Sequence, residues 1–165
     1  MDVDDSEDEQ ASAAERKASA RSQALRVLGR REQSGKELQA KLISQGFDQA
    51  CASEVVQDLA KIGWQSDRRY AELLVRSRIA QGYGPRRIEA ELATHGVDES
   101  TSRSALAEAE CDWSELAESV YRKRFKTPAA KLADRQKRYR FLAGRGFDAE
   151  QIRKALRSDA PDDSD

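Results

Sequence analysis

One pattern occurs three times in this chain of 165 residues. In each copy, a Leu stands four residues before a Gly, and a hydrophobic residue and an Asp directly follow that Gly. The three triplets are Gly46-Phe47-Asp48, Gly96-Val97-Asp98 and Gly146-Phe147-Asp148. Gly adopts the left-handed conformation that ends many helices, and Asp is a favoured N-cap for the next helix. The pattern therefore predicts a tandem repeat in which each unit contains a tight corner between two helices.

Other helix signals predict a third helix in each unit. Ser34 with Glu37, and Asp112 with Glu115, have the spacing of capping boxes, and Pro85 suits the first turn of a helix. The predicted helices lie near residues 20–31, 35–45, 49–61, 67–80, 85–95, 99–110, 113–126, 129–144 and 149–158. No segment alternates with a period of two, so we expect no strands. The predicted fold is all-α, with three tandem three-helix repeats at 20–62, 63–111 and 112–158 that form an elongated, curved body.

The net charge of -1 conceals a separation of charge along the chain. Residues 1–10 contain six acidic groups and residues 159–165 contain four, and we expect acidic disordered tails over 1–19 and 159–165. Without these ten of the 30 acidic residues, the rest of the chain contains 20 acidic and 29 basic residues and has a net charge of +9. This basic body favours a polyanion or an acidic protein surface as partner. The tails either keep the protein soluble or compete with that partner for the basic surface.

Arginine is concentrated in the middle repeat. The 21 residues from Asp67 to Arg87 hold six arginines and only two acids, which exceeds what pairing within that stretch can neutralise. A second basic cluster runs from the end of the predicted helix at 113–126 into the next helix and includes Arg138 and Arg145. Guanidinium groups suit phosphate and carboxylate recognition, although any single arginine can instead be a solvated residue paired with Glu or Asp. From charge and motif position, the candidate binding residues are Arg30, Arg31, Arg68, Arg69, Arg76, Arg78, Tyr83, Arg86, Arg87, Arg122, Lys123 and Arg124.

The sequence offers few residues for catalysis. His95 is the only histidine, and its place just before the Gly96 corner favours a capping or packing role. Cys51 and Cys111 are isolated, so neither a disulfide nor a zinc site is expected, and no phosphate-binding loop of the GxxxxGK[ST] type occurs. We therefore expect no enzyme activity, no catalytic residue, no metal and no cofactor. The absence of a signal peptide and of a long apolar run predicts a cytoplasmic protein with no membrane partner.

Three stretches of the chain resemble the RecX family. They are Arg31-Glu32-Gln33-Ser34, Asp67-Arg68-Arg69-Tyr70-Ala71 and Gly82-Tyr83-Gly84-Pro85-Arg86-Arg87-Ile88. Similarity extends through residues 137–156 and omits only the acidic ends, but the commonest family pattern has His where this chain has Gln33. The resemblance implies a bacterial regulator that lodges in the groove of the RecA–DNA filament. It also implies inhibition of ATP hydrolysis, strand exchange and coprotease activity, and thus modulation of recombination, DNA repair and the SOS response.

We therefore expect a monomer whose partner is the RecA nucleoprotein filament and, as for some members of the family, single- or double-stranded DNA. A stand-alone helical DNA-binding protein is the alternative, because each Gly-hydrophobe-Asp corner resembles the turn of a helix-turn-helix. Comparing affinity for bare DNA with affinity for the filament distinguishes the two. The sequence leaves open whether inhibition acts by capping filament ends, by coating the groove or by competing for DNA.

Overall fold

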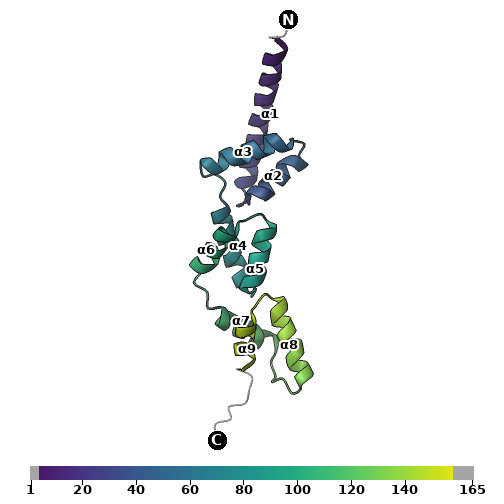
Figure 1. The fold of residues 1–165 in the computed structure, drawn as a ribbon, viewed down its shortest axis with the longest axis vertical. Coiled ribbons are helices and arrows are strands. Elements are labelled where there is room, and N and C mark those ends of the chain that lie inside the picture. Colours follow the sequence, from purple (N-terminus) through teal and green to yellow (C-terminus); the bar gives the residue numbers. More distant parts are fainter. Residues whose placement is uncertain (1–3, 158–165) are drawn as a thin grey trace. The chain divides into compact units, whose positions relative to one another are not determined.

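The structure is a computed structural model that describes residues 4–157 of the chain. These residues form nine α-helices and no strands. The helices are α1 (Asp4–Leu28), α2 (Gly35–Ser44), α3 (Gln49–Lys61), α4 (Asp67–Ala80), α5 (Pro85–Thr94), α6 (Glu99–Glu108), α7 (Trp113–Arg124), α8 (Leu132–Gly144) and α9 (Ala149–Arg157) (Figure 1). The predicted all-α class is confirmed. From α2 onward, each predicted helix agrees with the observed one to within three residues at either end.

The first helix is longer than the sequence predicted. α1 begins at Asp4, whereas the composition predicts a disordered tail over 1–19 and a helix only from residue 20. That expectation is wrong from Asp4 onward, because Ala and long unbranched side chains dominate residues 12–28 and favour helix more than the acidic composition of the first residues suggests. The predicted tail at 159–165 lies outside the described residues.

Each Gly-hydrophobe-Asp triplet forms the helix corner that the sequence predicted. The φ angles are 99° at Gly46, 76° at Gly96 and 95° at Gly146. Residues with a side chain rarely adopt such positive values, which explains the glycines. Each Asp carboxylate accepts a 2.8 Å hydrogen bond from the backbone N–H three residues later, in the pairs Asp48 with Cys51, Asp98 with Thr101 and Asp148 with Gln151. The corners therefore join helices through a glycine turn and a capping carboxylate.

The chain divides into two compact units. The first comprises Met1–Tyr70 with His95–Val97, and the second comprises Ala71–Thr94 with Asp98–Asp165. In the first unit, α1, α2 and α3 pack together around buried apolar side chains that include Leu38, Leu42, Val55 and Leu59. Phe47, from the first corner, packs against this core, as expected for a hydrophobic residue held between two helices.

The second unit contains the core of the third repeat, the part of α4 from Ala71 onward, and helices α5 and α6. Helices α7, α8 and α9 enclose Tyr121, Leu142, Phe147 and Ile152, with Phe147 supplied by the third corner. The buried side chains of α4 to α6 include Val75, Ile88, Leu92 and Ala105. These small cores leave most polar side chains on the surface, so binding residues must be sought on helix faces and at the turns.

Candidate functional site

In the second unit, the turn before α5 lies against the corner between α8 and α9. The Gly84 N–H donates to the carbonyl oxygen of Arg145 at 2.8 Å, and the Arg86 N–H donates to the carbonyl oxygen of Gly146 at 3.1 Å. The first N–H groups of a helix have no partner within that helix. Gly84, which precedes α5, has no side chain to cap them, so the α8–α9 corner supplies the acceptors.

Two guanidinium groups contact the aromatic ring of Tyr83 in this turn. The guanidinium carbon lies 4.3 Å from the ring centroid in Arg87 and 4.9 Å in Arg145, both within the range of cation–π attraction. Arg87 also donates to the carbonyl oxygen of Gly144 at 3.1 Å, and Arg145 donates to that of Gln81 at 2.9 Å. Tyr83 and Arg87, predicted as binding residues, therefore also hold the turn against the corner.

Ion pairs of 3.1 Å or less hold Arg69, Arg78 and Arg122 of the predicted set. The pairs are Arg69 with Glu32 at 2.9 Å, Arg78 with Glu91 at 2.5 Å and Arg122 with Glu118 at 3.1 Å. Glu32 and Glu91 lie outside the stretch from 67 to 87 in which the sequence showed an excess of arginine. Acids distant in the sequence thus neutralise part of that excess, at Arg69 and Arg78.

Four other predicted cations are exposed and form no ion pair or side-chain hydrogen bond with any described residue. They are Arg30, Arg76, Arg86 and Lys123. Because a cation without an internal partner gives up no existing contact when it binds an anion, these four are the strongest members of the predicted set.

The other predicted residues have weaker or less defined partners. Arg31 lies 3.9 Å from the carboxylate of Glu37, and the guanidinium of Arg124 lies 5.6 Å from the ring centroid of Phe125. Arg68 is located in the first turn of α4.

The predicted residues are divided between the two units. Arg68 and Arg69 belong to the first unit, whereas the arginines from Arg76 onward belong to the second, so the predicted centre of contact is divided between the two. Within the units, three pockets each contain a part of the set. The first pocket, of about 410 Å³, is lined by Arg30 and Arg31. The second, of about 460 Å³, is lined by Arg78, Tyr83 and Arg87. The third, of about 330 Å³, is lined by Lys123 and Arg124.

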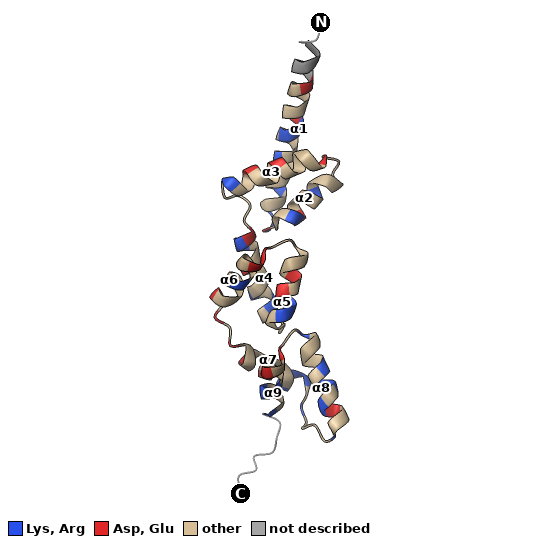
Figure 2. Ribbon diagram, in the orientation of Figure 1, with Lys and Arg blue, Asp and Glu red and all other residues tan. Residues whose placement is uncertain are grey.

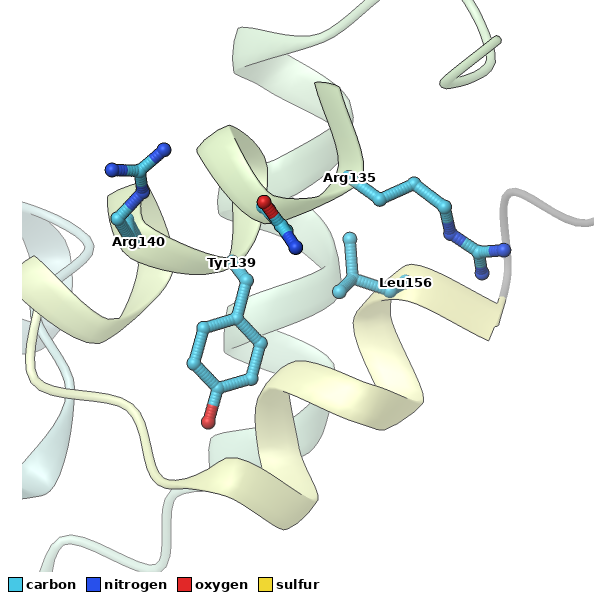
Figure 3. Close-up of a pocket in the computed structure, with 5 residues that line it drawn as sticks. Arg135, Tyr139, Arg140 and Leu156 are labelled. Carbon is cyan, nitrogen blue, oxygen red and sulfur yellow. The ribbon is translucent and has the colours of Figure 1, made fainter. Parts of the chain in front are cut away.

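A pocket that sequence reasoning missed lies between α8 and α9 (Figure 3). Its volume is about 420 Å³, and Tyr139 and Leu156 supply its apolar wall. Arg135 and Arg140 lie at opposite sides of it (Figure 3). None of the twelve predicted residues lines this pocket. The sequence showed only a basic helix with interspersed apolar positions. The pocket forms because α8 packs against α9.

Basic residues follow one another along α8 (Figure 2), but one of them is structural. Arg138 is only 4% exposed. It donates hydrogen bonds of 2.8 Å to the hydroxyl of Tyr121, the carbonyl oxygen of Thr127 and the carboxylate of Asp134. A guanidinium buried in such a network holds the segment between α7 and α8 and does not reach a partner.

His95 has the packing role that its position predicted. Its Nδ1 atom lies 3.1 Å from Oε1 of Glu37, which also accepts a hydrogen bond from the Tyr70 hydroxyl at 3.4 Å. The rings of Tyr70 and His95 meet edge to face, with centroids 5.8 Å apart. Within residues 4–157, no group of three or more His, Cys, Asp or Glu side chains is arranged to hold a metal ion. None of the described helices combines the length and apolar character that a membrane-spanning helix needs.

Comparison with known proteins identifies the family. Three family models match in order along the chain: the first three-helix domain of RecX at residues 20–59, the second at 66–106 and the third at 110–156. This chain belongs to the RecX family. The fold is therefore the tandem array of three three-helix repeats that the sequence predicted.

Curated relatives named regulatory protein RecX support the same assignment. The RecX of Stenotrophomonas maltophilia (strain R551-3) is 47% identical over 141 residues, which cover 85% of this chain and 86% of the relative. The RecX of Xanthomonas campestris pv. campestris (strain B100) is 46% identical over 140 residues, which cover 84% of this chain and 86% of the relative. The RecX of Chromohalobacter salexigens is 42% identical over 139 residues, which cover 84% of this chain and 91% of the relative.

Two crystal structures share the fold. The RecX of Lactobacillus salivarius superposes with a TM-score of 0.75 at 22% identity, covering 88% of this chain and 97% of that one. A second structure, of a regulatory protein RecX, gives a TM-score of 0.80 at 21% identity. The match covers 96% of this chain and 79% of that one. At these identities the likeness concerns the arrangement of helices alone.

Proposed function

We propose that this RecX-family chain is a non-enzymatic regulator that binds the groove of the RecA–DNA filament in the cytoplasm. Binding inhibits the ATPase, strand-exchange and coprotease activities of RecA, and so modulates recombination, DNA repair and the SOS response. The proposal is supported by the name that the relatives share, regulatory protein RecX, at up to 47% identity over 141 residues.

The observation that carries the proposal is a set of cations with no internal partner. Arg76 on α4, Arg86 on α5 and Lys123 on α7 are exposed and form no ion pair with a described residue. All three belong to the second unit. A nucleoprotein filament offers both phosphate groups and acidic side chains, to which such cations bind without first breaking an internal ion pair.

The decisive experiment measures RecA ATP hydrolysis on single-stranded DNA with this protein at sub-stoichiometric and equimolar ratios. We expect hydrolysis to fall at one or both ratios, and a fall at the sub-stoichiometric ratio would indicate that each bound molecule acts on many protomers. Full hydrolysis at both ratios would contradict the proposal.

The binding residues are tested by a double substitution, Arg76→Ala with Arg86→Ala. We expect weaker filament binding. We also expect the slope of the logarithm of the affinity against the logarithm of the salt concentration to become shallower by about one for each phosphate that the variant no longer neutralises. Lys137→Ala is the matched control, since Lys137 is also exposed, has no ion pair with a described residue and lies outside the predicted site. Arg87 is less suitable as a target, because its substitution would also remove the hydrogen bond to the carbonyl oxygen of Gly144.

Unpaired cations also suit bare DNA, so stand-alone DNA binding is the competing function. Labelled protein titrated at physiological salt onto RecA filaments, single strands and duplexes separates the two. Equal affinity for filament and bare DNA would assign the protein to the DNA-binding class and make contact with RecA incidental.

A further inference from the structure

Four basic residues line one pocket in the first unit, between α1, α2 and the segment that joins them. They are Arg26, Arg30, Arg31 and Lys41. The remaining lining residues are Gln23, Val27, Gln33 and Gln45, so the lining contains no carboxylate. The volume of about 410 Å³ is large enough for a phosphate group and the sugar attached to it.

The charge in this pocket is only partly compensated within the protein. Arg31 lies 3.9 Å from the Glu37 carboxylate, and Arg26 donates a long hydrogen bond of 3.4 Å to the amide of Gln23. The side chains of Arg30 and Lys41 have no partner among the described residues. Like charges around one hollow repel one another, and an anion bound in the hollow removes that repulsion.

A side-chain amide in the same lining adds a hydrogen-bonding group to the four cations. Gln33 is only 2% exposed, and its backbone carbonyl accepts a 3.2 Å hydrogen bond from Gln65. The side-chain amide of Gln33 forms no hydrogen bond with a described residue. An amide that lines the pocket without a partner in the protein can bind a ligand atom there without breaking an internal hydrogen bond.

We propose that this pocket binds a phosphate group, with Arg26, Arg30, Arg31 and Lys41 balancing its charge and Gln33 donating an amide N–H to one of its oxygens. A carboxylate is matched by a single arginine, whereas several cations that line one pocket and an amide donor match a group with more oxygens and more charge. The inference deepens the proposed function and rests on it for the source of the phosphate, which is the backbone of a nucleic acid. A free nucleotide carries the same group.

The test compares Lys41 of α2 with Lys61 of the neighbouring helix α3. Each lysine is the only basic residue in the last turn of its own helix. Lys61 does not line the pocket. Full-length Lys41→Glu and Lys61→Glu proteins are titrated, without RecA, with inorganic phosphate, ATP and a short oligothymidylate, and binding is followed by NMR. We expect Lys41→Glu to lower the affinity by about tenfold or more and Lys61→Glu by less than about twofold. Equal reductions in the two variants would mean that binding follows overall charge, and would overturn the inference.

Gln33→Met tests the amide at nearly constant side-chain volume. We expect weaker phosphate binding together with a nearly unchanged melting temperature, because the Gln33 amide forms no hydrogen bond with a described residue that the substitution would break. Unchanged binding would remove Gln33 from the site.

The three ligands identify where the phosphate comes from. Oligothymidylate binding that requires Lys41 supports a nucleic-acid backbone, and binding of ATP or inorganic phosphate alone supports a free phosphate compound. A glutamate peptide that binds as tightly as oligothymidylate, with the same dependence on Lys41, would overturn the phosphate assignment in favour of an acidic protein segment. Inhibition of RecA by Lys41→Glu is measured separately, so the proposed function stands or fails independently of this pocket.

Discussion

The backbones of Gly84 and Gly146 are in direct contact, because a Cβ atom on Gly84 would overlap the carbonyl carbon of Gly146. A related contact occurs in the first unit, where a Cβ on Gly96 would lie 2.9 Å from that of Lys36, near the start of α2. In both places, the glycine of a corner meets the beginning of the second helix of the preceding repeat. Gly96 and Gly146 thus have two roles, since they turn the chain and also allow another segment to approach.

Gly84→Ala is expected to destabilise the second unit. The methyl group would overlap the Gly146 peptide, and relief of that overlap would cost the hydrogen bond from Gly84 to Arg145. We expect the free energy of unfolding to fall by about 1 to 3 kcal/mol in denaturant titrations. Gly144→Ala is the control, because nothing lies within 4 Å of its added methyl group, and it should leave stability unchanged or raise it by roughly 0.5 kcal/mol.

Arg138→Ala is expected to destabilise the third repeat strongly. It would leave the Tyr121 hydroxyl and the Thr127 carbonyl without their donor and open a cavity beside α7. The expected decrease in free energy of unfolding is about 3 kcal/mol, whereas Lys137→Ala, one position away and exposed, should change it by less than about 0.5 kcal/mol. Equal stability of the two variants would show that the buried network contributes little.

Arg76 and Arg78 are expected to differ although they lie two residues apart on α4. Arg78 pairs with Glu91, and both side chains are 26% exposed, so Arg78→Ala should lower the free energy of unfolding by about 1 kcal/mol. Arg76→Ala should leave stability unchanged and weaken binding to the RecA filament. Thermal melts and filament-binding titrations on both variants check this separation, and an equal effect of both on binding would argue against it.

Asp98 is expected to make stability depend on acidic pH. The hydrogen bond from the backbone N–H of Thr101, reinforced by the Thr101 hydroxyl, lowers the pKa of the Asp98 carboxyl. Because the folded pKa lies below the unfolded value, the contribution to stability is complete above about pH 5 and is lost as the pH falls through the folded pKa. Asp98→Asn keeps a capping oxygen but does not titrate, so its melting temperature should fall less on acidification. Parallel pH profiles for the two proteins would contradict this expectation.

Most of the fold could be predicted from the sequence because its signals are local. Gly96 and Asp98 specify a corner through their own backbone and side-chain preferences, and Pro85 marks the start of a helix. α1 is the exception. There the acidic composition of the first residues suggests disorder, although the helix propensity of the following residues extends the helix to Asp4.

The candidate site could be predicted less well because its properties depend on distant residues. Counting acids near Arg69 and Arg78 gives an excess of positive charge, but their partners Glu32 and Glu91 come from other parts of the chain. Arg138 resembles its neighbours in the sequence and is nevertheless buried. The lining around Gln33 brings together residues from two helices and the segment between them, and no local signal specifies such a pocket.

The hydrogen bonds that begin α5 make two amides useful as reporters of motion. Gly84 and Arg86 donate to carbonyl oxygens of the following repeat and not to their own helix. Exchange of these two amide protons with deuterium therefore measures how often the α8–α9 corner separates from α5 while both remain helical. Bending of the second repeat against the third can thus be followed in the unmodified protein, with and without RecA filaments.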